Sequence, residues 1–407
     1  MVLAIFAIVY LGMFLGELPR LQLDRAGVAL LGAIALVVSG SMTLDRAVSH
    51  VDVPTLALLF GMMVLSAQLR LGGAYAALTQ RASSLARGAP ALLGMVVATV
   101  GLLSAVFTND IVALAVAPVV VDLCRTRRLD PLPFLLAVAC AANVGSAATL
   151  VGNPQNILVG QTLHLSFVGY LARAALPAAA GLAVVWGVVA SAYRGRWEWS
   201  DGGTPDADAA WHPPLPRFDS WHAAKGLILA GLAMMAFLFT PWPREVVALA
   251  AAGIVLTSRR FHSRDMLALV DWQLLVLFGG LFMVNGALAD TGVVERTMAW
   301  LADRGVDAAD PAWLFTLSVV LSNAVSNVPA VMLLLPAVEG ERLGALLALS
   351  STLAGNLLIV GSIANIIVVE QARAAGITVD WRTHARIGLP VTLLTLAVAA
   401  VTLAILG

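Results

Sequence analysis

Long apolar stretches alternate with short polar connections along the whole chain. In the first half the apolar stretches cover 2–18, 26–40, 53–70, 89–124, 132–160 and 167–193. In the second half they cover 225–240, 244–257, 271–290, 311–338, 343–370 and 385–406. Most approach or exceed the roughly 20 residues that a helix needs to cross the hydrocarbon core of a bilayer. The pattern predicts an all-α polytopic membrane protein.

Polar residues interrupt four of these apolar stretches. The interruptions are Thr108-Asn109-Asp110, "GNPQN" at 152–156, "SNV" at 326–328 and "GSIAN" at 361–365. Lipid cannot satisfy freed backbone N–H and C=O groups, so a chain break at membrane depth must be buried in protein or line a cavity. We expect a re-entrant hairpin at the first and third breaks, and a broken membrane-crossing helix at the second and fourth.

The two halves of the chain repeat this order. "DVPTLALLFGMMVL" at 52 resembles "DWQLLVLFGGLFMV" at 271, and Thr108-Asn109 corresponds to Ser326-Asn327 at an offset of 218 residues. "VGNPQNI" at 151 corresponds to "VGSIANI" at 360, at an offset of 209. Three matches in the same order indicate internal duplication. We expect a first repeat at 1–193, a linker rich in Gly, Pro and Asp at 194–222, and a second repeat at 223–407.

The membrane topology follows from the number of crossings. With one broken helix and one hairpin that leaves on its own side, each half crosses the bilayer five times, so the second repeat is inverted relative to the first. In this layout 18 of the 24 Arg and Lys residues fall on one face. The positive-inside rule puts that face in the cytoplasm. Both termini are therefore expected outside the cell membrane and the linker inside.

Composition excludes several classes of function. Hydrophobic residues make up 60% of the chain and charged residues only 12%, with a net charge of zero. A soluble protein carries about 25% charged residues, and a neutral chain lacks the basic footprint of a nucleic-acid binder. The six histidines read as parts of polar connections without an HExxH motif, and no nucleophile–base pair is apparent. We therefore expect no enzyme, and no disulfide between Cys124 and Cys140.

The breaks supply the candidate site. Their side chains and freed backbone groups could replace the hydration shell of an ion, and a helix that starts at mid-depth presents a positive N-terminus to an anion. The predicted substrate- or ion-binding residues are Thr108, Asn109, Asp110, Asn153, Asn156, Ser326, Asn327, Ser362 and Asn365.

Structural roles are the alternatives for most of these residues. Asn109 and Asn327 could act only as helix N-caps, and Asn153, Asn156 and Asn365 could satisfy freed backbone groups. Three further polar residues near the breaks could serve as substrate contacts or as helix–helix hydrogen bonds; they are Ser146, Thr149 and Asn356. Pro118 and Pro336 favour kinks.

Asp110 has a different character. It is the only carboxylate that we place near mid-depth, and the corresponding residue of the second repeat is Val328. No Lys or Arg lies close in sequence, and a buried carboxylate without a cation favours its protonated form. Asp110 is thus expected to carry the coupling proton, or to bind sodium when ionised. The alternative is that it caps the second arm of its own hairpin.

The chain resembles the ion transporter superfamily that includes arsenite permeases, sodium–proton antiporters and citrate or dicarboxylate transporters. The resemblance lies in "FTNDIVALAVAP", "NVGSAATLVGNPQNILV", "DWQLLVLFGGLFMVNGALADTGVVE", "SNAVSNVPAVMLLLP" and "GNLLIVGSIANIIVVE". It implies inverted repeats with substrate bound at the hairpin tips, where Thr108, Asn109, Ser326 and Asn327 match the motif. It also implies a homodimer with elevator-type motion.

The expected function is secondary transport of a small anion, or of arsenite, coupled to protons or sodium. Arsenite would pass as the neutral hydroxide, because two cysteines cannot form a three-thiolate site. A sodium–proton antiporter using Asp110 and an ion channel are the alternatives. We expect no cofactor beyond the coupling ion. No Walker motif occurs, so any ATPase partner would be a separate chain.

Overall fold

The computed structural model describes residues 1–16, 23–198 and 217–406, and these residues form helices without an extended β-strand. The first half contains α1 (Val2–Leu15), α2 (Arg25–Val38), α3 (Leu44–Ser49), α4 (Val53–Leu71), α5 (Ala74–Ser84), α6 (Ala89–Val106), α7 (Asn109–Thr126), α8 (Pro131–Ser146), α9 (Pro154–Thr162) and α10 (Phe167–Ala192). The second half contains α11 (Ser220–Phe239), α12 (Arg244–Leu256), α13 (Ser263–Leu267), α14 (Trp272–Asp290), α15 (Val293–Ala302), α16 (Pro311–Val325), α17 (Asn327–Leu334), η1 (Leu335–Ala337), α18 (Gly340–Ala354), η2 (Ile359–Gly361), α19 (Ile363–Ala374) and α20 (Trp381–Leu406).

The all-α membrane fold predicted from the sequence is confirmed. Within the described residues, six helices are long and apolar enough to cross a membrane, and several shorter apolar helices accompany them. The six are α4, α6, α10, α11, α14 and α20.

The chain breaks at all four predicted places. The hairpins turn between α6 and α7 and between α16 and α17, where Ser326 adopts a φ of 77°. That left-handed conformation is strained for a residue with a side chain. The broken helices are interrupted between α8 and α9 and between α18 and α19. Pro154 starts α9, as expected of a residue whose missing N–H costs nothing at the first helical position.

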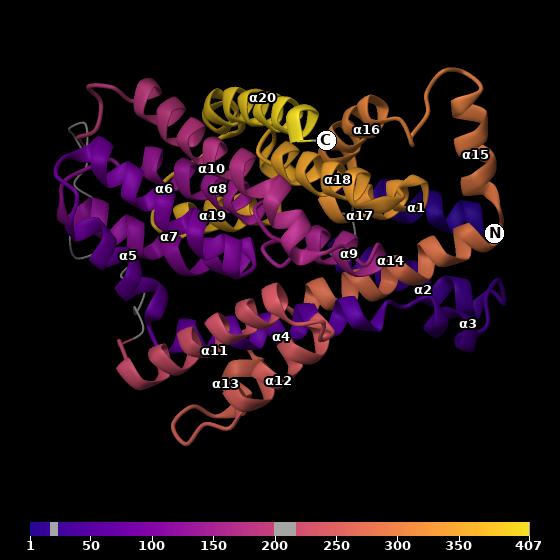
Figure 1. Ribbon diagram of the computed structural model, residues 1–407, viewed down its shortest axis with the longest axis horizontal. Helices are drawn as coiled ribbons and strands as arrows, with labels where there is room; N and C mark the ends of the chain where they lie inside the picture. The colour runs from indigo at the N-terminus through magenta and orange to yellow at the C-terminus, as the bar shows by residue number, and fades with distance from the viewer. Residues whose placement is uncertain (17–22, 199–216, 407) are drawn as a thin grey trace.

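Elements of the two halves are interleaved (Figure 1). Helix α19, drawn in yellow, lies among the purple helices of the first half and packs against α7 and α8. The close contacts are reciprocal: a Cβ on Gly61 of α4 would lie 2.7 Å from the carbonyl carbon of Ala248 in α12, and one on Gly280 of α14 would lie 2.7 Å from that of Ala29 in α2. These matching pairs fit the duplication; the inversion of the second half stays a prediction.

Two local expectations about polar segments were wrong. Helix α11 starts at Ser220, inside the predicted linker 194–222, because the Asp219 side chain accepts from the backbone N–H of His222 and caps the helix. His222, chiefly through that N–H and its ring, holds the pKa of Asp219 below its usual value, and Arg260 adds to the effect. The histidines do not all lie in connections either, since His222 and His384 are buried within α11 and α20. The rest of the predicted linker, 199–216, lies outside the described residues.

The hairpin and the broken helix of the first half meet without room for a side chain. A Cβ on Gly145 in α8 would lie 2.3 Å from the carbonyl oxygen of Gly101 in α6. We expect Gly145→Ala to destabilise the protein by about 1–3 kcal/mol, the usual cost of overpacking, as a lower midpoint of thermal unfolding. Gly231→Ala in α11 is the matched control, because nothing lies within 4 Å of its added Cβ; equal midpoints for both variants would contradict the prediction.

Candidate functional site

Four helix starts meet at the breaks and form what we call the polar centre. These are the N-terminal ends of α7, α9, α17 and α19, together with the C-terminal parts of α8 and α18. The backbone N–H of Asn109, the first residue of α7, donates to the carbonyl oxygen of Gly152 just before α9 at 3.0 Å. Each hairpin tip is thereby placed against a broken helix.

Asn143 of α8 joins the two halves. Its amide oxygen accepts from Nδ2 of Asn109 at 2.9 Å and from Oγ of Ser362 at 2.8 Å. Its amide nitrogen donates to Oδ1 of Asn356 at 2.8 Å and to Oδ1 of Asn365 at 3.0 Å. All four hydrogen-bonding positions of this fully buried amide are therefore used.

Asn156 and Asn365 have equivalent partners in the two broken helices. Nδ2 of Asn156 donates to the carbonyl oxygens of Ser146 and Thr149 at 3.2 and 3.0 Å. Nδ2 of Asn365 donates to those of Gly355 and Leu358, at 2.8 and 3.1 Å. Ser146 corresponds to Gly355, and Thr149 to Leu358, at an offset of 209 residues. This is the same offset that relates the "VGNPQNI" and "VGSIANI" motifs.

The amide oxygens of Asn156 and Asn365 each accept a hydrogen bond from the other half of the chain. Asn365 accepts from Asn143 of α8, and Asn156 accepts from Oγ1 of Thr352 in α18 at 3.0 Å. Thr352 corresponds to Asn143, so each broken helix is bonded to the other half through equivalent positions. This arrangement ties α8, α9, α18 and α19 into one unit.

The last long helix of each half also reaches the breaks. In α10 the hydroxyl of Tyr170 donates to the carbonyl oxygen of Ala147 at 2.9 Å, and in α20 Nε2 of His384 lies 3.0 Å from the carbonyl oxygen of Asn356. Ala147 and Asn356 occupy equivalent positions. The two halves thus use a tyrosine and a histidine for the same contact.

The second hairpin tip contacts the first half. With its amide nitrogen turned toward them, Asn327 donates to the carbonyl oxygens of Ser351 and Gly361 at 3.1 and 3.2 Å, and its oxygen accepts from Nε2 of Gln155 at 3.1 Å. Gln155 also donates to Oγ1 of Thr352 at 3.0 Å. The polar residues of α9 and α17 are thereby brought together.

Asp110 is buried at the N-terminus of a helix of the other half. Its carboxylate accepts the backbone N–H of Ala364, in the first turn of α19, and Asp271 is close enough to repel it. The partial positive charge of the helix start favours the ionised form, and burial opposes it. Asp110 also lies in the first turn of α7, so the alternative that it caps its own hairpin arm stays a prediction.

Several buried oxygen atoms near the tips have no hydrogen-bond partner among the described residues. Thr108 Oγ1 and Asn109 Oδ1 lie on the first hairpin, and Ser322 Oγ and Asn323 Oδ1 lie on the second. Buried polar atoms are rarely left unpaired, so each of these four oxygens is a candidate contact for an ion or a water molecule. Neutral oxygens of this kind are suitable ligands for a hard cation.

The alternative role of Asn109 and Asn327 as helix N-caps is not observed. Asn109 and Asn327 are the first residues of α7 and α17, and the N-cap residues Thr108 and Ser326 make no side-chain cap bond. Asn153 precedes α9 and donates to Oγ of Ser146 at 3.3 Å.

Other polar residues near the breaks have structural contacts. Oγ1 of Thr149 donates to the carbonyl oxygen of Ala105 at 2.6 Å, which joins the broken helix to the hairpin. Asn356, in contrast, belongs to the polar centre through Asn143 and His384.

The sequence interpretation missed Asn143, whose side chain has four hydrogen-bond partners. Asn143 lies inside the apolar helix α8, ten residues before Asn153 and outside the four polar interruptions. A lone amide in a fully buried helix was the available signal, and so was the polar residue, Thr352, at its repeat position. Gln155 and His384 were missed as well.

Comparisons with known proteins agree with this architecture. Residues 1–345 match the family described as citrate transporter. The chain is 28% identical to the silicon efflux transporter LSI3 of Oryza sativa subsp. japonica, over 94% of this chain and 93% of that protein. It is 31% identical to an uncharacterized transporter of Mycobacterium tuberculosis, over 93% of each. The YdaH transporter of Alcanivorax borkumensis has a similar fold, with a TM-score of 0.58 and 17% identity over 99% of this chain and 96% of that one.

Proposed function

Because the chain belongs to the citrate transporter family, and is thus a multi-pass membrane transporter and not an enzyme, we propose that it is a secondary active transporter. Its substrate is a small anion or a small uncharged hydroxide such as arsenite, and a proton or a sodium ion is coupled to transport. Substrate binds at the polar centre and gains access from the two sides of the membrane in turn.

The convergence of four helix starts at one buried centre carries this proposal. Each N-terminus offers N–H groups and roughly half a positive charge. The hydrogen bonds that meet there come from amides and hydroxyls, with His384 at the edge. Such a site attracts an anion without fixing it by a permanent ion pair, and its amides also suit a neutral hydroxide with several O–H groups.

The coupling ion is proposed to bind at the first hairpin. Asp110 supplies a carboxylate, and the unpaired oxygens of Thr108 and Asn109 are its neighbours in sequence. Oxygen ligands with one negative charge suit sodium when the carboxylate is ionised, and the same carboxylate can carry a proton. Sodium–proton exchange at Asp110 is therefore the second candidate function, in which the cation is itself the transported species.

The topology belongs to the proposal as well. Both termini lie outside the cell membrane and the connection between α10 and α11 lies inside, with two copies of the chain in a homodimer. Gly203→Cys in the linker should react with a membrane-impermeant maleimide only after the cells are opened. Labelling of intact cells would overturn the topology and leave the polar centre unaffected.

Gradient-driven flux tests the function directly. We expect purified protein in proteoliposomes to accumulate one of arsenite, silicic acid, citrate or sulfate when a proton or sodium gradient is imposed, and not after the gradient is collapsed with an ionophore. Rapid flux that never exceeds equilibration under any gradient would indicate a channel. Movement of sodium against protons with none of the four substrates would favour the antiporter.

A further inference from the structure

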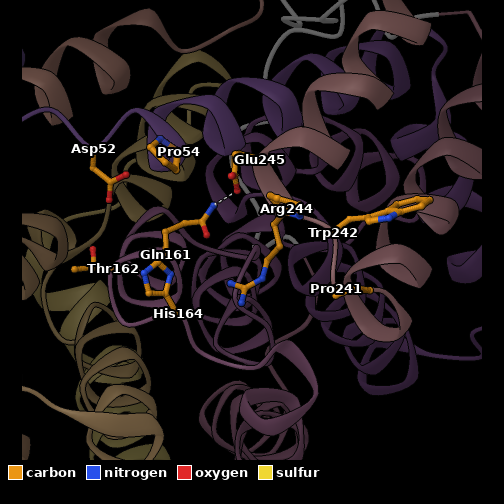
Figure 2. A pocket seen from close by; sticks show the side chains of 10 residues that line it. Asp52, Pro54, Gln161, Thr162, His164, Pro241, Trp242, Arg244 and Glu245 are labelled. Carbon is orange, nitrogen blue, oxygen red and sulfur yellow. Dashed lines mark hydrogen bonds between the residues drawn. The ribbon is translucent and has the colours of Figure 1, made fainter.

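A cavity lies beside the end of α9, next to the starts of the helices α4 and α12 (Figure 2). Its volume is about 580 Å³, and its lining includes Asp52 and Pro54 at the start of α4 and Arg244 and Glu245 at the start of α12. It lies at the opposite end of α9 from the polar centre. Two side chains of α12, those of Arg244 and Glu245, reach toward α9 beside this space.

Arg244 and Glu245 fasten the end of α9. The guanidinium of Arg244 donates from Nη1 to the carbonyl oxygen of Gly160 at 3.3 Å, and from Nη2 to that of Leu165. Nε2 of Gln161 donates to Oε2 of Glu245 at 3.0 Å (Figure 2). The carbonyls at a helix C-terminus carry partial negative charge, so a guanidinium is favourable there. We call these five residues the α9 latch.

The second half holds the components of the same latch. Arg25 is the first residue of α2, as Arg244 is of α12, and the contacts of Ala29 with Gly280 and of Ala248 with Gly61 show that α2 and α12 are equivalently placed. Helix α19 corresponds to α9 through the matching bonds of Asn365 and Asn156, and at the position of Gln161 it carries a glutamate, Glu370.

The components of this second latch are not bonded to one another. Across the part of the chain that the structure describes, no side-chain hydrogen bond or ion pair involves Arg25 or Glu370; Nε of Arg25 is buried without a partner, and Glu370 is exposed. Helix α9 packs against α4, whereas α19 has no comparable contact with α14. The last turn of α19 is instead held by α7, because Nη2 of Arg125 donates to the carbonyl oxygen of Ala375 at 2.9 Å.

The two broken helices cannot move independently. The polar centre joins α8, α9, α18 and α19, while the pairs α4–α12 and α2–α14 form a separate framework with a contact between α4 and α14. Because α9 and α19 belong to one unit, a movement that brings the end of α19 toward Arg25 also displaces α9.

We propose that Arg244 and Arg25 are matched positioning residues, each of which holds the C-terminal end of one broken helix in one of two transport states. This structure has the Arg244 side closed. In the other state Arg25 donates to the last carbonyls of α19 and pairs with Glu370. The inference rests on the proposed alternating-access function, and it assigns to these arginines the balance between the two states.

Thiol labelling tests this without any substrate. Leu165→Cys places a reporter in the α9 latch, and the native Cys124 and Cys140 are buried, so background labelling should be low. In nanodiscs of phosphatidylethanolamine and phosphatidylglycerol, Arg244→Ala should raise the maleimide labelling rate roughly tenfold, within the usual range of conformational couplings. Arg25→Ala should lower the rate, and Arg296→Ala in the exposed helix α15 should leave it unchanged. Changes in the same direction for both arginine variants would overturn the proposal.

A cross-link gives a second test, which remains valid if Arg244→Ala fails to fold. The double variant Arg25→Cys and Glu370→Cys should be joined by a short bismaleimide, because the other state brings these positions together. When Leu165→Cys is combined with this double variant, we expect the reporter to be labelled faster after the cross-link has formed. The Gln161→Cys and Glu245→Cys pair is the positive control. If this pair is cross-linked efficiently and the Arg25→Cys and Glu370→Cys pair is not, the second latch is refuted. Neither readout depends on the identity of the substrate, so flux could fail in the assay while the latch is confirmed.

Discussion

Replacing Asn143 with leucine is expected to abolish transport and to lower the thermal stability of the protein. The leucine side chain has the same branched shape and the same number of heavy atoms, but it is bulkier and cannot hydrogen bond. Its presence would leave Nδ2 of Asn109 and Oγ of Ser362 without their acceptor, and Oδ1 of Asn356 and Asn365 without their donor. All four partners are buried. An unsatisfied buried polar group costs about 1–3 kcal/mol, although hydrogen bonds inside membrane proteins average nearer 0.6 kcal/mol.

The free energy of unfolding should therefore decrease by several kcal/mol at most. The bonds that are lost lie where the hairpin tips and the broken helices meet. Thermal unfolding in detergent measures the stability, and gradient-driven flux in proteoliposomes measures the function. Asn285→Leu is the matched control: Asn285 accepts from the hydroxyl of Tyr10 at 2.9 Å and donates to the carbonyl of Leu281 and to Sδ of Met332 in α17, and among the described residues it has no hydrogen bond to either broken helix. Equal behaviour of the two leucine variants would show that Asn143 is not the junction that its contacts indicate.

A partial rescue separates packing from hydrogen bonding. Thr352 occupies the place of Asn143 in the other half and holds Asn156 with a hydroxyl. Asn143→Thr supplies one donor and retains acceptor capacity, so it should recover part of the stability that Asn143→Leu loses. If threonine and leucine are equally damaging, the size of the side chain, and not its hydrogen bonds, limits the site.

The sequence predicted the places where the chain breaks better than what the broken ends touch. Thr108-Asn109-Asp110 and Ser326-Asn327 interrupt apolar stretches, and such interruptions are visible because a membrane helix has little other reason to contain them. The partners of Asn143 lie more than 200 residues further along the chain, apart from Asn109. Local patterns carry no information on such pairs.

Errors at the helix ends have a similar origin. "DWRTHARIG" looks like a connection because four of its residues are charged or histidine, yet α20 begins at Trp381 and buries His384 against the carbonyl of Asn356. The helix includes His384 because this residue is held by the carbonyl oxygen of Asn356, in the break between α18 and α19. Tyr170 makes the equivalent contact in α10, but it precedes His384 by 214 residues and not by the repeat offset of 209. A comparison of polar residues at that offset would have found Asn143 and Thr352, and not His384.

Asp110→Asn is expected to abolish coupling while the protein stays folded. The asparagine oxygen can still accept the N–H of Ala364 at the start of α19, so the contact between the halves is retained. The amide cannot bind or release a proton near neutral pH, and it offers sodium no negative charge. We therefore expect flux that no longer responds to an imposed proton gradient, or to a sodium gradient if that is the driving ion, with a thermal midpoint close to that of the native protein.

The control for this experiment lies on the same helix. Asp122→Asn removes a carboxylate three turns further along α7, where the side chain is not fully buried, and should leave both the rate and its pH dependence unchanged. The corresponding position in the second hairpin is Val328, so one carboxylate in the two hairpins would set the coupling stoichiometry. Two results would contradict this role. Native rate and pH dependence in Asp110→Asn would remove Asp110 from coupling altogether. A lower thermal midpoint with an unchanged pH profile would show that the carboxylate serves only as the cap of α19, and the coupling site would then have to lie among the neutral oxygens of the hairpin tips.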